Sequence, residues 1–261
     1  FEPVVRGTDL FGLGDSDHKG QMFAHIKAIE AWLRAEGRLP INVKCLFEGE
    51  EEIGSPNLKP FLDRNRQTLS AGAALISDMP IPGPDRPAIT YAMRGALAFE
   101  LELRGPRRDL HSGLYGGAVH NPIQALTEML AKMHDGAGRI AIPCFYDAVR
   151  RWDERERAFM ARNGPRDAEI LRETGALPWG EHGFTLYERT TIRPALTVNG
   201  LVGGYGGPGG KAVIPARALA KLSFRLVPDQ DPDRVERLFR RFVAPVQPPP
   251  VRVAIRRPSS A

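Results

Sequence analysis

The chain has 261 residues, of which 42% are hydrophobic and 26% charged, and its formal net charge is +5. No stretch approaches the roughly 20 apolar residues that a membrane-spanning helix needs, which argues against a membrane protein. The basic residues alternate with acidic ones, as in 150–157, and no nucleic-acid-binding motif accompanies them, so a nucleic-acid partner is not expected either.

The first third of the chain alternates helix and strand patterns. A Gly-rich turn leads into an amphipathic helix over 21–36, whose apolar residues predict one buried face. The apolar run 41–47 predicts a buried strand, 57–69 a second helix and 73–77 a second strand. This alternation predicts part of a parallel α/β sheet.

Carboxylates accompany these segments. Asp17 lies in the Gly-rich turn, a cluster of glutamates directly follows 41–47, and Asp78 follows 73–77. Ligands of open α/β sheets bind at the carboxyl ends of the strands, and crowded carboxylates repel one another unless a cation neutralises them. Hard oxygen ligands therefore indicate a divalent-metal centre. The alternative is that the glutamates begin an exposed helix and the aspartates form turns or caps.

The pattern changes after the proline-rich loop 80–87, which predicts a break between two domains, 1–89 and 90–261, and a hinge. An irregular, partly helical insertion is expected at about 140–194. Without it the order is βαβ-βαβ, which predicts a ferredoxin-like α+β domain with a four-stranded antiparallel sheet covered by two helices. The expected strands are 97–103, 195–202, 217–227 and 251–255, and the expected helices are 121–133 and 232–243.

The two cysteines, Cys45 and Cys144, have no CxxC spacing, and Cys45 is expected to be a buried thiol. A disulfide framework is therefore not expected, and a cytoplasmic location is favoured. The Gly-rich run 203–211 fails as a phosphate loop, because Tyr205 and Ala212 stand where that motif needs Gly and Ser or Thr. We expect it to be a flexible connection between two strands.

Several motifs, in this order, resemble the two-metal exopeptidase family, which includes carnosinases, bacterial dipeptidases, aminoacylases, acetylornithine deacetylases and glutamate-releasing carboxypeptidases. The dipeptidase branch is the most similar. The motifs are Asp17-His18-Lys19-Gly20, Glu48-Gly49-Glu50-Glu51-Glu52-Ile53-Gly54-Ser55, Ser77-Asp78, Asp109-Leu110-His111-Ser112-Gly113-Leu114-Tyr115-Gly116-Gly117, Val198-Asn199-Gly200, Lys211-Ala212-Val213-Ile214-Pro215 and Arg225-Leu226-Val227-Pro228.

The resemblance implies hydrolysis of the amide bond of dipeptides or small peptides, with two divalent metal ions activating a water. Zinc is expected, with manganese or cobalt as alternatives. The resemblance makes Asp17 the bridging ligand and assigns Glu52 and Asp78 to one metal each. Glu51 would be the general base, and Glu50, which matches no ligand position, is expected to be solvated.

In the resembled family the second domain is a lid that forms a homodimer. His111 would reach the partner's substrate and stabilise the tetrahedral oxyanion, and Arg225 would bind the terminal carboxylate of the substrate. Asn199 and Gly200 would shape the same pocket. Without the resemblance, His111 would be read as an ordinary loop histidine and Arg225 as a surface arginine.

The chain also departs from the family pattern. His18 replaces a usual acidic residue, Leu13 an arginine and Ala212 a threonine. The first and last metal-binding histidines of the family would lie before Phe1 and after Ala261, so we expect an internal fragment that is inactive by itself. Two alternatives remain open: deacylation of N-acyl amino acids on the same scaffold, and a non-catalytic dimerisation module.

Overall fold

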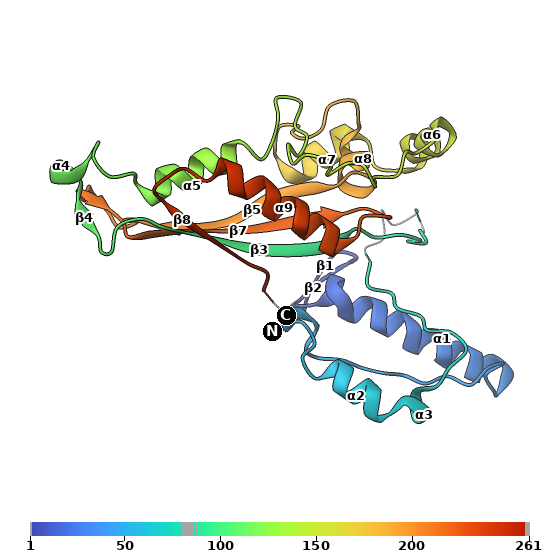
Figure 1. Ribbon diagram of the computed structural model, residues 1–261. Coiled ribbons are helices and arrows are strands. Elements are labelled where there is room, and N and C mark those ends of the chain that lie inside the picture. The colour runs from blue at the N-terminus through green and yellow to red at the C-terminus, as the bar shows by residue number, and fades with distance from the viewer. Residues whose placement is uncertain (1, 80–85, 87, 259–261) are drawn as a thin grey trace. The chain divides into compact units, whose positions relative to one another are not determined.

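The computed structural model describes residues 2–79, 86 and 88–258. The chain divides into two compact units, Phe1–Thr90 and Tyr91–Ser260 (Figure 1). Apart from Arg86, the predicted hinge loop 80–87 lies outside the described residues. No helix in the described ranges is both long and apolar enough to cross a bilayer.

The first unit is built mainly of helices. The predicted helix 21–36 is confirmed, and the predicted helix 57–69 is present in two pieces that meet at Asn65. A short antiparallel hairpin, which the sequence did not predict, precedes them. The hairpin consists of β1 Val4–Arg6 and β2 Asp9–Phe11. The helices of the first unit are α1 Gly20–Glu36, α2 Leu58–Arg64 and α3 Arg66–Leu69.

The two strands predicted at 41–47 and 73–77 are wrong as strands. Neither segment pairs with another strand among the described residues, although the mixed α/β class of the chain is confirmed. Phe47 is 62% exposed and Ile76 is 83% exposed, so these runs are not buried. A strand is stable only when its backbone groups are paired with a neighbouring strand, and these runs have no such partner within residues 2–79.

The first unit also has little core of its own. No side chain in residues 2–79 is buried, and the apolar face predicted for α1 is exposed, with Phe23 at 58% and Trp32 at 50%. Cys45, expected to be buried, is exposed and free. Its expected burial depended on the strand that does not form.

The second unit confirms the predicted ferredoxin-like arrangement. Four strands pair antiparallel in the order β5-β7-β3-β8, so β5 and β8 are the sheet edges. The strands are β3 Gly95–Arg104, β5 Ala195–Gly203, β7 Arg217–Leu226 and β8 Arg252–Arg256. Arg256 at the end of β8 pairs with Glu100 of β3, so β8 runs back toward the start of β3.

Two helices, α5 Pro122–Ala131 and α9 Pro232–Val246, cover one face of this sheet (Figure 1). Each begins after an Asn or Asp cap followed by proline, the preferred start of a helix. Alternate strand residues point at the helices, so that Phe99 of β3, Phe224 of β7 and Phe239 of α9 form one aromatic cluster. All three are at most 1% exposed. Truncating such a phenylalanine typically costs about 3–5 kcal/mol.

The predicted insertion holds three helices, α6 Glu154–Asn163, α7 Asp167–Thr174 and α8 Leu186–Thr191. Two buried or half-buried ion pairs fix it. Arg193 donates to both carboxylate oxygens of Glu181 at 2.8 Å, and Arg157 donates to Glu188 at 2.6 Å. Because both glutamates are buried and paired, the insertion is an ordered part of this unit.

Candidate functional site

Two of the sequence motifs meet in a small ribbon at one end of the second unit (Figure 1). β4 Leu110–His111 pairs antiparallel with β6 Val213–Ile214, and His111 lies opposite Val213. Asp109, which precedes β4, also connects the two strands, because its carboxylate accepts a hydrogen bond of 2.8 Å from the backbone N–H of Ala216, which follows β6. The motif around His111 and the motif 211–215 are therefore one structural element.

His111 has a defined ring orientation. It caps the short helix α4 Ser112–Tyr115, and its Nδ1 accepts a hydrogen bond of 3.1 Å from the N–H of Gly113. An accepting Nδ1 carries no proton, so the neutral ring must carry its proton on Nε2. The side chain is exposed. His111 thus presents a hydrogen-bond donor away from its own backbone, as stabilisation of an oxyanion requires.

Arg225 lies on β7, on the face of the sheet that the helices leave uncovered. No ion pair with Arg225 is found within the described part of the chain. Arg94, which the sequence reading missed, lies near it. Burial and the neighbouring charge of Arg225 both lower the pKa of Arg94. Arg94 is itself held by the carbonyl oxygens of Arg189 and Arg193, at 3.2 and 3.4 Å. The pair makes this end of the strand attractive to a carboxylate.

Asn199 and Gly200 lie at an irregularity of the edge strand β5. Val198 pairs with Leu222 and Gly200 with Lys221, so Asn199 is the extra residue of a bulge. A bulge leaves its extra residue outside the ladder and re-aims side chains. Asn199 is exposed. The bulge was not predictable from strand periodicity, since one extra residue looks the same in sequence as a longer strand.

The acidic residues of the first unit are positioned by turns. Glu51 and Glu52 lie in a single 3₁₀ turn, Glu51–Ile53, and both are exposed. Glu50 is not freely solvated as expected: it is half-buried, and its carboxylate accepts hydrogen bonds of 2.9 to 3.2 Å from the backbone and side chain of Asn57. Glu50 therefore fixes the turn that presents its two neighbours.

Asp17 and Asp78 lie in separate segments. Asp17 is exposed in the turn Asp15–Lys19 before α1, and its peptide bond to His18 is cis. Asp78 is exposed and follows Ser77, whose Oγ lies 2.8 Å from Nε2 of His25 on α1. His25 thereby connects α1 to the segment that carries Asp78.

These carboxylates do not form a metal centre as they lie. Within residues 2–79, 86 and 88–258, no three side chains of His, Cys, Asp or Glu come together as a group that could hold a metal ion. The expected ligands are carboxylates alone, whereas zinc sites are normally completed by imidazole or thiolate. The metal roles of Asp17, Glu52 and Asp78 remain predictions.

The second unit, which carries the ribbon at His111, matches a domain of a known peptidase family. Residues 91–250 match the family model described as the peptidase dimerisation domain, the M20 type. This match covers more than half of the chain, and the chain belongs to this family.

Characterised relatives resemble the chain beyond that domain. It is 33% identical over 241 residues to the Cys-Gly metallodipeptidase dug1 of Schizosaccharomyces pombe, covering 91% of this chain and 50% of the relative. It is 33% identical over 244 residues to the Beta-Ala-His dipeptidase of Homo sapiens, covering 91% and 47%. The chain thus spans about half the length of the curated relatives it matches.

Two solved structures have a similar fold over nearly the whole chain. Human carnosine dipeptidase 1 superposes with a TM-score of 0.77 at 29% identity, over 98% of this chain and 56% of that one. The M20 family metallo-carboxypeptidase Sso-CP2 of Sulfolobus solfataricus superposes with a TM-score of 0.80 at 34% identity, over 96% and 57%. The similarity therefore includes the first unit, where the acidic motifs lie.

Proposed function

We propose that the protein to which this chain belongs is a metal-dependent dipeptidase that hydrolyses the amide bond of dipeptides or small peptides. One observation carries the proposal: the similarity to two dipeptidases, one of them named as a metallodipeptidase, extends over 91% of this chain and so includes the acidic motifs as well as the dimerisation domain. In this proposal residues 1–89 belong to the catalytic domain and 90–261 to the lid.

In this proposal several residues of the chain have separate roles in the reaction. Glu51 takes a proton from the attacking water and returns it to the leaving amine, a role that suits a carboxylate held on a tight turn. His111 donates a hydrogen bond from its Nε2–H to the oxyanion of the substrate bound by the partner subunit. Arg225, with the positive charge of Arg94 behind it, binds the terminal carboxylate of the substrate, and Asn199 and Gly200 shape that pocket.

Divalent metal use enters the proposal through the family. We propose two ions, zinc before manganese or cobalt, with Asp17, Glu52 and Asp78 as the ligands that this chain supplies. Metal ions in such enzymes polarise the carbonyl and acidify the attacking water. The imidazole ligands that zinc prefers would have to come from elsewhere in the whole protein.

We also propose that two copies pair through the lid. Among the described residues the edge strand β5 pairs with β7 alone, and Leu201 and Val202 on it are 56% and 64% exposed. Exposed apolar edges of this kind favour pairing with another strand. The matched family's description as a dimerisation domain supports the same assignment.

The test is an assay of the complete gene product, with zinc or manganese, on Cys-Gly, on β-Ala-His and on N-acetylated amino acids. We expect dipeptide hydrolysis that a chelator abolishes and that Glu51→Gln lowers by about 10²–10⁴-fold in kcat. Glu48→Gln, an exposed neighbour in the same motif, is the matched control and should retain activity.

Other outcomes would replace the proposal. Preferred cleavage of acetylated amino acids would make the protein a deacylase. Absence of hydrolysis for every substrate and metal, with a stable dimer in sedimentation, would leave only the dimerisation role.

A further inference from the structure

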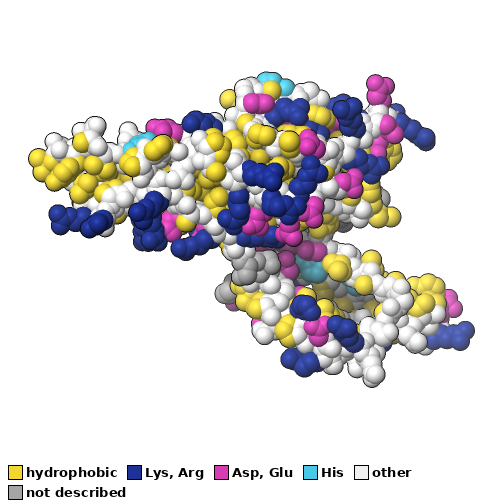
Figure 2. Space-filling view, in the orientation of Figure 1, with side chains coloured by type: hydrophobic (Ala, Val, Ile, Leu, Met, Phe, Trp, Pro, Cys, Tyr) yellow, Lys and Arg dark blue, Asp and Glu magenta, His cyan; other side chains and the backbone are white. Residues whose placement is uncertain are grey.

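The helix α9 has more arginine than its acidic neighbours can neutralise. Arg240 pairs with Glu236, and Arg257 pairs with both Asp233 and Glu236. Arg237 and Arg241, one turn apart, make no ion pair with any described residue. Lys and Arg side chains accordingly gather over α9 in Figure 2. Two like charges at this spacing repel each other, so an anion between them would be stabilising.

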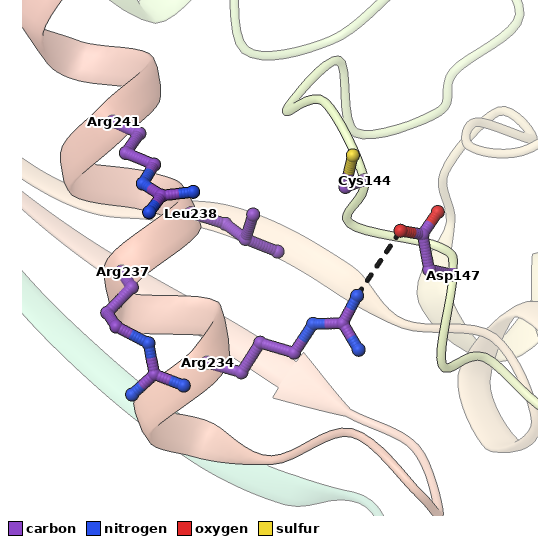
Figure 3. Close-up of a pocket in the computed structure, with 6 residues that line it drawn as sticks. All are labelled: Cys144, Asp147, Arg234, Arg237, Leu238 and Arg241. Carbon is purple, nitrogen blue, oxygen red and sulfur yellow. Dashed lines mark hydrogen bonds and ion pairs between the residues drawn. The ribbon is translucent and has the colours of Figure 1, made fainter.

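Opposite α9 lies a wall formed by the turn 144–147, and Arg234 and Leu238 extend from the helix toward it (Figure 3). Arg234 reaches from α9 to Asp147 and pairs with its carboxylate at 3.2 Å, so that wall is electrically neutral. The wall also carries Cys144, next to the buried Phe145. The carbonyl of Phe145 accepts a hydrogen bond of 3.1 Å from the buried side chain of Gln230. The facing turn is thereby anchored in the core.

Between the helix and this wall lies a hollow of about 320 Å³. Leu238, packed against the core, lines it between the arginines, and the remaining lining residues are Cys144, Asp147, Arg234, Arg237 and Arg241. This volume is at the small end for ligand sites, which suits a small ligand and not a whole nucleotide.

We propose that this hollow binds a small phosphoryl compound of the pyrophosphate or phosphate-ester type, held by Arg237 and Arg241. Guanidinium groups bind phosphate and carboxylate through paired hydrogen bonds. A phosphoryl group offers three acceptor oxygens and up to two charges at one centre, so it can serve both arginines at once. A carboxylate offers only two acceptor oxygens and one charge, so each carboxylate of glutarate is expected to bind the arginines more weakly. The site lies wholly within the second unit and does not depend on the proposed dipeptidase activity.

The test is calorimetric titration of the 261-residue chain with pyrophosphate, inorganic phosphate and glutarate at constant ionic strength. We expect saturable pyrophosphate binding with a Kd below about 1 mM, and glutarate at least about tenfold weaker. Arg237→Gln/Arg241→Gln should lose at least about tenfold in affinity. Arg240→Gln, on the same helix but paired with Glu236, should bind as the unaltered chain does.

A chemical readout gives an independent check. In a Cys45→Ser background, bound pyrophosphate should slow alkylation of Cys144 by iodoacetamide, because this thiol lines the hollow. Circular dichroism of each variant establishes that it is folded. Equal binding by the double variant, equal binding of glutarate, or unchanged alkylation of Cys144 at saturating pyrophosphate would each overturn the site.

Discussion

At the scale of single residues, the ring of His111 is oriented by a glycine two positions later. A Cβ atom added at Gly113 would lie 2.9 Å from Cε1 and 3.1 Å from Nδ1 of that ring. The glycine therefore leaves room for the ring and supplies the N–H that fixes its tautomer. The sequence identified His111 through its motif, but nothing in residue order showed which ring nitrogen would be free.

This contact makes a prediction about activity. Gly113→Ala should push the ring of His111 aside and lower the kcat of the complete enzyme by about tenfold or more, approaching the roughly 10²–10³-fold loss expected for His111→Ala. The measurement is dipeptide hydrolysis at saturating substrate. Gly206→Ala, where an added Cβ meets nothing within 4 Å, is the control. Full activity of Gly113→Ala would separate the glycine from the function of His111.

At the scale of secondary-structure elements, the insertion depends on the start of α8. Glu188 closes a capping box with Thr185 and also pairs with Arg157. Burial raises the pKa of Glu188, but hydrogen bonds from Arg157 and Thr185 together outweigh it, so the pKa lies below its ordinary value of 4.5. The ionised carboxylate is therefore more stable in the folded state than in the unfolded one.

The sign of the pH effect follows. Below pH 4.5 the unfolded chain takes up a proton at this position before the folded chain does, so the free energy of unfolding falls as the pH drops through the folded pKa. Glu188→Gln should cost about 2 kcal/mol at pH 7, and the cost should shrink on acidification. Urea unfolding at pH 7 and at pH 3–4 measures this, with exposed Glu173→Gln as the control. A cost independent of pH would contradict the assignment.

Elements were predictable from sequence where alternation and burial agree. Every second residue of β3 from Leu97 to Leu103 faces the helices, and the sequence located this strand and the other three strands of the sheet. The runs 41–47 and 73–77 are also apolar, but no strand pairs with them among the described residues. The two-residue strands β4 and β6 are too short to show any periodicity, so their pairing could not be foreseen. Arg94 was missed because it belongs to no motif.

At the scale of the whole chain, the two units differ in how much they bury. The described core lies entirely between Leu97 and Val251, and residues 2–79 contribute no buried side chain. Hydrophobic burial is the main source of folding stability, so backbone openings should cost far less in the first unit.

This difference predicts hydrogen-exchange behaviour. Amides of α1 should exchange at least about 10²-fold faster than those of β3 and β7 in the 261-residue chain, which mass spectrometry of peptic peptides can measure. Peptides from α5 and α9 provide an internal helical reference. Equal protection of α1 and α5 would show that the first unit buries its apolar face in solution.

The pairing of β8 with β3 has a practical consequence for engineering. Since the chain enters on one of these strands and leaves on its antiparallel neighbour, both connections emerge at the same end of the sheet. The second unit could therefore be moved into another protein as one piece, since its two ends lie close enough to enter a single loop of the host. A short linker would join the two ends left in the parent protein, and the strand pairing of the transferred sheet would be unchanged.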